Sequence, residues 1–152
     1  IAELTARLAT EKARALADKY PAHLIIGSDQ SAAIDGHQLE KPGNHERAFT
    51  QLTRLSGRTV TFHTAVAVFD SRTTTLQSAM DITEVQFRSL TAAEINSYLT
   101  AEQPFDCAGS FKVEGLGISL FTRVVSEDPT ALIGLPLIKL CQLLRNTGVS
   151  LP

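Results

Sequence analysis

Asp29 is the first residue whose type and position could support catalysis. It follows the apolar run at positions 23–28, which predicts a short β-strand, so we expect its carboxylate at a strand end. Folds of the α/β type bind ligands at strand ends, and a carboxylate held there could act as a general base. A turn or capping aspartate fits the same pattern, so the residues alone leave both roles open.

Two lysines could supply positive charge to an anionic ligand. Lys12 lies four residues from both Leu8 and Leu16, so a helix would place its ammonium on the row that faces the core. Lys41 precedes Pro42, which favours an extended backbone and could aim the ammonium at an anion. Solvated lysines, one in a helix and one in a loop, remain the alternatives.

The segment Gly109–Gly117, with the sequence GSFKVEGLG, is a third candidate. It places the charges of Lys112 and Glu114 among three glycines within nine residues. Glycines let a backbone approach a ligand closely, so a binding loop is one interpretation. An ordinary surface loop is the other.

The remaining reactive residue types show no pattern of a known site. No P-loop, dinucleotide-binding, zincin or Gly-x-Ser-x-Gly motif occurs. Cys107 and Cys141 form no Cys-x-x-Cys pair, so we expect small buried apolar side chains, and neither a disulfide framework nor a zinc site. This cysteine usage favours a reducing, cytoplasmic location. The histidines lack ligand spacing, and we expect them at surface or sheet positions: His23, His37, His45 and His63.

The composition excludes several classes of partner. With 14 Lys and Arg against 16 Asp and Glu, the net charge is −2, which argues against nonspecific binding to a nucleic acid polymer. No apolar run approaches the roughly 18 to 20 residues that cross a bilayer, so no membrane partner is expected. The 152 residues suit one cored domain. The oligomeric state stays open, with a homodimer as one option.

The elements that must position these residues alternate between helix and strand. Apolar periodicity predicts helices at 1–20, 44–55, 91–99 and 135–145. Apolar and β-branched runs predict strands at 23–28, 31–34, 38–41, 58–69, 82–87 and 118–125. Turn and cap signals are Asp35-Gly36 for a hairpin, Asn44 for an N-cap and Thr91-x-x-Glu94 for a capping box. This order predicts a single domain over residues 1–152, of α/β or α+β class, with helices flanking a mixed β-sheet.

In combination, these short motifs resemble the Maf family of nucleotide pyrophosphatases, in the same order and over essentially the whole chain. The matching segments are Glu11-Lys-Ala13, Gly27-Ser-Asp-Gln30, Lys41-Pro42, Ser56-Gly57, Ala108-Gly-Ser-Phe-Lys-Val-Glu-Gly115 and Leu132-Ile-Gly-Leu-Pro136. The resemblance implies a Maf/ITPase-like α/β fold. The family's N-terminal strand and its Ser/Arg phosphate-binding loop have no counterpart in this sequence, so we expect an N-terminally truncated version of that fold.

Two positions resemble one branch of this family. Gln30 follows the aspartate where pyrimidine-directed members commonly have Thr, and Glu114 stands where they commonly have Gln. Both resemble the YceF-like branch, which is associated with 7-methyl-GTP, so the resemblance implies substrate-specificity roles for these two residues. A 7-methylguanine base is positively charged and carries N1–H and N2–H donors that the Glu114 carboxylate could accept.

The resemblance also implies a hydrolase that splits the α–β phosphoanhydride of a nucleoside triphosphate, releasing a monophosphate and pyrophosphate. Asp29 would activate water for attack at the α-phosphorus, while Lys12 and Lys41 would bind the phosphates. A divalent cation, Mg²⁺ or Mn²⁺, is implied as cofactor, with Asp29 as a candidate ligand. The leading expectation is hydrolysis of 7-methyl-GTP. A noncatalytic nucleotide-binding or regulatory module, and a pyrophosphatase for other non-canonical or pyrimidine nucleotides, are the alternatives.

Overall fold

In a computed structural model the chain forms two compact units, and the structure describes all 152 residues. Unit 1 comprises Ile1–Gln30, His63–Thr83 and Ser126–Pro152. Unit 2 comprises Ser31–Phe62 and Glu84–Val125. Each unit has its own packing and is described in turn.

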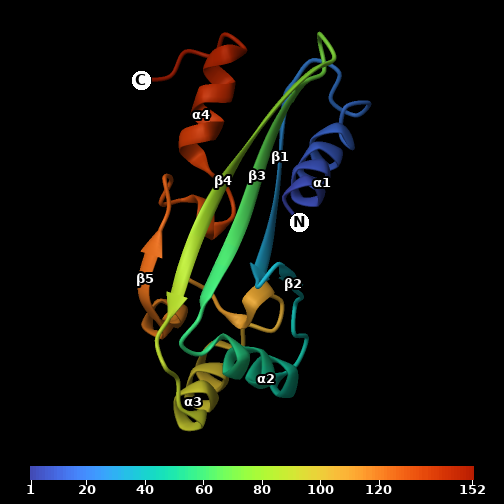
Figure 1. Cartoon of the computed structure of the whole chain (residues 1–152). Coiled ribbons are helices and arrows are strands. Elements are labelled where there is room, and N and C mark those ends of the chain that lie inside the picture. The colour runs from blue at the N-terminus through green and yellow to red at the C-terminus, as the bar shows by residue number, and fades with distance from the viewer. The chain divides into compact units, whose positions relative to one another are not determined.

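Helices and strands interleave along the chain (Figure 1). The helices are α1 (Ala2–Arg14), α2 (His45–Leu55), α3 (Ala92–Glu102) and α4 (Leu137–Asn146). The strands are β1 (Leu24–Ile34), β2 (His37–Leu39), β3 (Thr59–Asp70), β4 (Thr75–Phe87) and β5 (Phe121–Val125). Three 3-10 segments are η1 (Ala108–Ser110), η2 (Leu116–Leu120) and η3 (Ala131–Ile133). None of the helices combines the length and apolar character that a membrane span requires.

The strands follow the order β2-β1-β3-β4-β5 in an antiparallel sheet. The predicted α/β class, with helices beside a sheet, is confirmed. The sheet itself is antiparallel where a mixed sheet was expected. Tight turns join β1 to β2 and β3 to β4, and a short turn can only reverse the direction of the chain.

β1 is longer than the sequence predicted. It covers 11 residues and passes through Asp29 and Gln30, so the two expected strands are one. The polar pair does not stop the strand, because each side chain has a distant partner: Lys12 for Asp29 and the Ala131 carbonyl for Gln30. The expectation that Asp29 lies at a strand end is therefore wrong.

Several other boundaries also differ from the sequence pattern. α1 ends at Arg14, and the residues up to Lys19 form turns. β4 begins at Thr75, because the tight turn after β3 starts the pairing earlier than the apolar residues indicate. β5 begins at Phe121, after the 3-10 segment η2.

In unit 1, α1 packs on one face of the strands at close range. A Cβ atom on Gly27 would lie 2.2 Å from the carbonyl oxygen of Ala9 and 2.5 Å from the backbone nitrogen of Ala13. Such distances leave no room for a side chain, so only glycine permits this approach. An apolar cluster forms on this face: Ala9, Ala13, Ile25, Ala65, Ala67 and Phe69.

α4 covers the other face of the unit 1 strands (Figure 1). Side chains alternate along β3, so Val66 and Val68 point away from their neighbours in the α1 cluster. They pack against Leu140 and Leu143 of α4. Unit 1 therefore carries one helix on each face of its strands.

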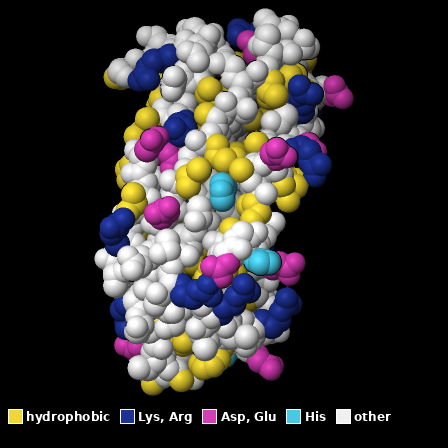
Figure 2. All heavy atoms as spheres, viewed as in Figure 1, with side chains coloured by type: hydrophobic (Ala, Val, Ile, Leu, Met, Phe, Trp, Pro, Cys, Tyr) yellow, Lys and Arg dark blue, Asp and Glu magenta, His cyan; other side chains and the backbone are white.

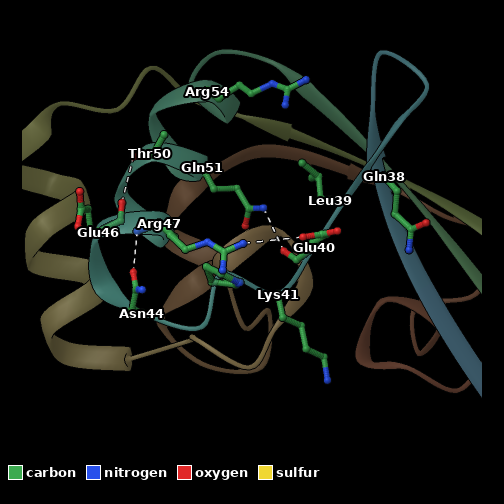
Figure 3. Close-up of a pocket in the computed structure, with 11 residues that line it drawn as sticks. Gln38, Leu39, Glu40, Lys41, Asn44, Glu46, Arg47, Thr50, Gln51 and Arg54 are labelled. Carbon is green, nitrogen blue, oxygen red and sulfur yellow. Dashed lines mark hydrogen bonds and ion pairs between the residues drawn. The ribbon is translucent and has the colours of Figure 1, made fainter.

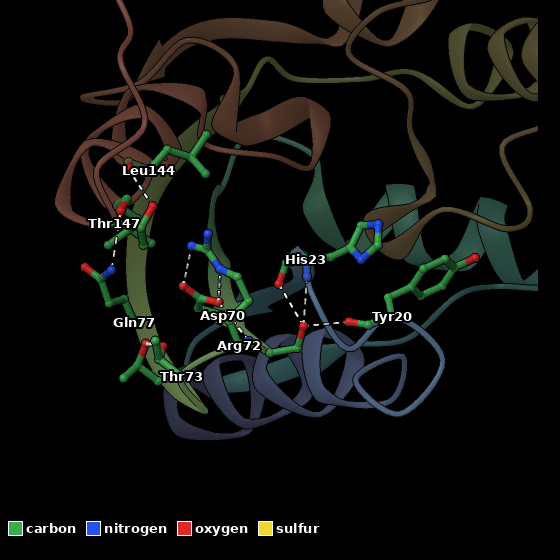
Figure 4. Close-up of polar contacts among 11 residues, drawn as sticks. Tyr20, His23, Asp70, Arg72, Thr73, Gln77, Leu144 and Thr147 are labelled. Carbon is green, nitrogen blue, oxygen red and sulfur yellow. Dashed lines mark hydrogen bonds and ion pairs between the residues drawn. The ribbon is translucent and has the colours of Figure 1, made fainter.

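Polar contacts close the turn between β3 and β4 in unit 1 (Figure 4). The Ser71 hydroxyl accepts the N–H of His23 at 2.9 Å and donates to the Tyr20 carbonyl at 2.5 Å. The Arg72 guanidinium donates to both carboxylate oxygens of Asp70, at 3.0 and 2.8 Å. These hydrogen bonds and the charge of Arg72 lower the pKa of Asp70 to about 2.

In unit 2, the turn at Asp35 and Gly36 joins β1 to β2. Both residues have positive φ angles, 51° and 76°, as a two-residue hairpin turn requires. Ala32 lies opposite Leu39 in the antiparallel pairing. The hairpin predicted from the sequence is confirmed.

Both predicted helix caps of unit 2 are also confirmed. The Asn44 side chain accepts the N–H of Arg47 at 2.9 Å and starts α2. At the start of α3, the Glu94 N–H donates to the Thr91 hydroxyl at 3.2 Å, and the Thr91 N–H donates to the Glu94 carboxylate at 2.8 Å. These bonds satisfy amide groups that a helix start leaves unpaired.

An aromatic cluster joins the strands of unit 2 to the long loop after α3. Its rings meet edge to face, with centroids 4.8 to 5.5 Å apart. The members are Phe62, Phe87, Phe111 and Phe121. Because Phe111 belongs to the Gly109–Gly117 segment, the cluster anchors that segment to the sheet.

Candidate functional site

Lys12 and Asp29 form a close ion pair in unit 1. Lys12 Nζ donates to Oδ1 of Asp29 at 2.6 Å and to the backbone carbonyl of Ser28 at 3.1 Å. The side chain of Asp29 is 15% exposed and that of Lys12 is 56% exposed. No hydrogen bond engages Oδ2 of Asp29, so this oxygen can accept a proton or contact a cation.

Gly27 explains why these two charges meet. Residues two apart in a strand share a face, so Gly27 and Asp29 both face α1. Gly27 lets the backbone of Ala13 approach β1, and Lys12 precedes Ala13 in the last turn of α1. The close helix packing therefore sets the lysine over the carboxylate.

Gln30 lies on the opposite face of β1 from Asp29. Its amide nitrogen donates to Thr64 Oγ1 at 2.9 Å and to the carbonyls of Ala131 and Leu132 at 3.0 and 3.2 Å. The amide group is thus committed to the η3 segment. This geometry suits a residue that positions a loop.

In unit 2, Lys41 lies between β2 and α2, on the rim of a cavity of about 600 Å³ (Figure 3). Its side chain points away from Arg54, and no hydrogen bond or ion pair engages its ammonium. The N–H of Gly43 donates to the carbonyl of Phe105 at 2.9 Å, which ties this segment to the loop after α3. Basic and acidic side chains are interspersed on the face shown in Figure 2.

The charges of Lys41 and Glu114 influence Asp106 and Cys107, which are adjacent residues of the loop after α3. A hydrogen bond from Cys107 lowers the pKa of Asp106, and the charges of Lys112 and Lys41 lower it further. Burial raises the pKa of Cys107 to about 11, with Asp106 and Glu114 adding to the rise. The Cys107 thiol is therefore protonated at neutral pH, which argues against a nucleophilic role.

The segment that carries Glu114 is fixed at its beginning. Gly109 and Ser110 both have positive φ angles, 79° and 61°. The buried Ser110 hydroxyl donates to Oε1 of Gln51 in α2, and Phe111 enters the aromatic cluster. Glu114 is exposed, and no hydrogen bond or ion pair engages its carboxylate. It is free to accept hydrogen bonds from a ligand.

A family model described as "Maf-like protein" matches residues 1–147. The chain belongs to the Maf family. The resemblance drawn from the short motifs is thus confirmed over nearly the whole sequence.

Curated relatives of this Maf protein carry the name "7-methyl-GTP pyrophosphatase". One from Xanthomonas axonopodis pv. citri is 56% identical over 149 residues, covering 98% of this chain and 77% of the relative. One from Cupriavidus pinatubonensis is 54% identical over 142 residues, covering 93% and 71%. One from a Polaromonas species is 52% identical over 148 residues, covering 97% and 68%.

Within this Maf protein the five predicted site residues fall into two groups. Unit 1 holds Lys12, Asp29 and Gln30, and it brings the first two into direct contact while Gln30 faces away from Asp29. Unit 2 holds Lys41 and Glu114, which both influence the Asp106–Cys107 pair without touching each other. The roles of all five in substrate binding and catalysis stay predictions.

Ser28 is a positioning residue that the sequence reading passed over. Its hydroxyl lies 2.8 Å from the Ala65 carbonyl and 2.7 Å from the Gly134 carbonyl. Ser28 and Gln30 share a face of β1, and together they hold the 131–134 segment. Its place directly before Asp29, within the Gly27-Ser-Asp-Gln30 motif, could have indicated this role.

Asp128 is a second residue missed by the sequence reading. It is 1% exposed, and its carboxylate accepts the N–H of Thr130 at 2.8 Å and that of Ile138 at 2.6 Å. Burial would raise its pKa, but a hydrogen bond from the Thr130 hydroxyl and these two backbone bonds outweigh burial, so the pKa is lowered. Asp128 thereby shapes the turn before Leu132–Pro136 and starts α4. The Asp-Pro-Thr sequence, typical of a turn, could have revealed it.

The carboxylate oxygen available at Asp29 suits a divalent cation that takes its other ligands from a substrate. No cluster of three or more His, Cys, Asp or Glu side chains is arranged to hold a metal ion. Asp29 offers Oδ2 as a carboxylate ligand, since Lys12 engages only Oδ1. Mg²⁺ commonly takes one or two protein carboxylates and completes its shell with waters and substrate phosphates. The residues therefore fit the divalent cation that the family resemblance implies, with Asp29 as its candidate ligand.

Proposed function

We propose that this Maf protein hydrolyses 7-methyl-GTP at the bond between the α- and β-phosphates, yielding 7-methyl-GMP and pyrophosphate. The observation that carries the proposal is the Asp29 carboxylate, largely buried and oriented by Lys12 at 2.6 Å. Relatives at 52% to 56% identity that bear the name 7-methyl-GTP pyrophosphatase support this choice of substrate.

Asp29 is the proposed general base. Water attacks the α-phosphorus, the new oxygen–phosphorus bond forms, and the bond from the α-phosphorus to the bridging oxygen breaks. The proton of the attacking water passes to the carboxylate of Asp29, and pyrophosphate leaves. Lys12 holds the carboxylate in one orientation through Oδ1, which preserves Oδ2 for this proton.

Charge on the phosphates is balanced by cations of the chain. Lys41 contributes an ammonium that forms no ion pair with a carboxylate. Lys12 lies beside the reacting carboxylate and offers a second ammonium. A Mg²⁺ or Mn²⁺ ion held by the substrate phosphates would neutralise further phosphate charge and favour departure of pyrophosphate, and Oδ2 of Asp29 would then serve as the base.

Glu114 is the residue proposed to recognise the base of the substrate. Its exposed carboxylate can accept the N1–H and N2–H donors of 7-methylguanine, and its negative charge complements the positive charge of the methylated ring. Glutamine at this position would keep an acceptor and lose the charge. Gln30 contributes to specificity indirectly, by holding the η3 segment from the other face of β1.

Pyrophosphate release is the direct test. The protein is assayed with Mg²⁺ or Mn²⁺ on 7-methyl-GTP, GTP, dTTP and UTP, and the products are separated to distinguish pyrophosphate from orthophosphate. We expect 7-methyl-GTP to be the best substrate and to yield equal amounts of 7-methyl-GMP and pyrophosphate. Turnover of dTTP or UTP at an equal or higher rate would overturn the substrate choice.

Two variants separate chemistry from recognition. Asp29→Asn keeps the shape of the side chain and removes the base, so we expect kcat to fall by roughly 10² to 10⁴. Glu114→Gln should raise KM for 7-methyl-GTP more than KM for GTP. Full activity of Asp29→Asn contradicts the mechanism. Calorimetric binding of 7-methyl-GTP without any hydrolysis would instead support a noncatalytic nucleotide-binding module.

A further inference from the structure

Glu114 stands at the apex of a short turn, residues 112–117, which we call the Glu114 turn. The N–H groups of Gly115 and Gly117 both donate to the carbonyl of Lys112, at 3.3 and 3.0 Å. A Cβ atom on Gly117 would lie 2.2 Å from that carbonyl oxygen, so the turn closes tightly on Lys112. The main chain on both sides of Glu114 is therefore constrained, while its side chain stays exposed.

Two side chains of α3 meet this turn, one on each side of Glu114. The N–H of Lys112 donates to the hydroxyl oxygen of Tyr98 at 3.1 Å. The N–H of Leu116 donates to Oε2 of Glu102 at 2.8 Å. Tyr98 and Glu102 are four residues apart, so they project from the same face of the helix. A single rigid element thus holds both flanks of the turn.

The carboxylate of Glu102 also fills the space directly beside the turn. A Cβ atom on Gly115 would lie 2.5 Å from Oε1 of Glu102 and 2.6 Å from Oε2. Gly115 has a φ of −111°, which any residue can adopt, so a side chain at this position would have to displace the Glu102 carboxylate. Glu102 is therefore packed against the backbone that follows Glu114.

Tyr98 is itself fixed and neutral. It is 5% exposed, and burial raises the pKa of its hydroxyl, with the nearby charges of Glu102 and Glu114 adding to the rise. A protonated hydroxyl keeps its oxygen available to accept the N–H of Lys112. The contact from Tyr98 to the N–H of Lys112 therefore persists across the neutral pH range.

We propose that Glu102, together with Tyr98, is a positioning residue that sets where the Glu114 carboxylate meets the base of the substrate. This inference rests on the proposed function, because it assumes that Glu114 reads the base. Base recognition by one carboxylate depends on its placement, and a small displacement weakens its hydrogen bonds. Glu102 acts through the Leu116 N–H and touches no substrate atom in this scheme.

The test compares Glu102→Ala with Glu102→Gln. Alanine removes the acceptor for the Leu116 N–H, whereas glutamine keeps an amide oxygen in the same place. We expect Glu102→Ala to raise KM for 7-methyl-GTP roughly tenfold, with kcat changed less than about twofold. Glu102→Gln should have the same KM for 7-methyl-GTP as the unmodified protein. Asn96→Ala, an exposed change on the same helix, is the matched control and should alter neither constant.

Amide hydrogen exchange gives a readout that does not depend on activity. Exchange at the Leu116 amide should accelerate in Glu102→Ala and stay slow in Glu102→Gln and Asn96→Ala. If Glu102→Ala does not fold, Tyr98→Phe replaces it, because it removes the acceptor on the other flank, and the same KM effect is expected. Unchanged KM in a folded variant with accelerated exchange at the turn would overturn the proposal.

A double-mutant cycle separates this inference from the proposed function. If Glu102 acts through Glu114, Glu102→Ala should have little further effect on KM in the Glu114→Gln background. Equal effects in both backgrounds would overturn the positioning role and leave base reading by Glu114 intact. A Glu114→Gln variant with unaltered KM for 7-methyl-GTP would instead remove base reading by Glu114 from the proposed function, and the inference with it.

Discussion

Asp29 and Gln30 are consecutive residues of β1, and their side chains reach opposite faces of the strand. Asp29 pairs with Lys12 of α1, while Gln30 donates to the carbonyls of Ala131 and Leu132. The alternation of side chains along a strand thus assigns two tasks to one dipeptide. Asp29 faces α1 and Lys12, and Gln30 holds the η3 segment on the other face.

Lys12→Met should reduce activity more than stability. The ion pair with Asp29 is half exposed on the lysine side, so its loss should cost less than about 1 kcal/mol of unfolding free energy. In the proposed mechanism the ammonium lies beside the phosphates and is worth far more in the transition state, so we expect kcat/KM to fall by roughly 10². Thermal melting and steady-state kinetics measure the two effects.

Lys19→Met is the matched control for this change. It removes the same charge from an exposed lysine that forms no ion pair. We expect its kcat/KM to match that of the unmodified protein. A similar loss of activity in both variants would show that overall charge, and not the contact with Asp29, explains the effect of Lys12→Met.

Gln30→Ala should lower the free energy of unfolding. It leaves the Leu132 carbonyl without its amide donor, and a buried carbonyl left unpaired costs about 1 to 3 kcal/mol. The Ala131 carbonyl keeps the Thr64 hydroxyl and the Gly134 N–H as donors. Urea unfolding should show the loss, while Gln142→Ala, an exposed change on α4, should not. If Gln30→Ala instead shifts the preference between 7-methyl-GTP and dTTP at unchanged stability, Gln30 contacts the substrate directly.

Local signals in the sequence were sufficient where local contacts decide the structure. Asn44 and Thr91 cap helices through bonds to amides three residues away, and the Asp35-Gly36 turn sets its own backbone geometry. Such features depend on a few neighbouring residues, so a pattern of residue types predicts them well.

Structural features that depend on long-range contacts could not be predicted from the sequence. β1 continues through Asp29 because Lys12, 17 residues earlier, satisfies its carboxylate. Neither the pairing nor the close helix approach at Gly27 follows from periodicity. The motif resemblance selected Lys12 and Asp29 together, but it gave no sign that Gln30 would face the other way. Glu102 was overlooked because a helix-end glutamate is common on protein surfaces.

Asp70 should make stability depend on pH in the acid range. Its pKa is lowered to about 2 in the folded chain by Arg72, whereas an unfolded aspartate titrates near 3.8. The pair therefore stabilises the fold fully above about pH 4, and this contribution is lost as the pH falls toward 2. Asp70→Asn should melt below the unmodified protein at pH 6, with the difference shrinking between pH 4 and pH 2. Asp18→Asn, at an exposed and unpaired aspartate, is the control, and a difference independent of pH would contradict the assignment.

Cys107 should react slowly with alkylating reagents and should be dispensable for hydrolysis. Its pKa is raised to about 11, so at pH 8 its thiolate fraction is roughly 200-fold below that of an ordinary cysteine with a pKa near 8.5. In a Cys141→Ala background, the rate of iodoacetamide labelling should rise with pH toward a midpoint near 11. Cys107→Ala should keep its activity on 7-methyl-GTP. A loss of activity beyond tenfold at unchanged melting temperature, or a labelling midpoint near 8.5, would mean that the thiol is more reactive than its burial implies.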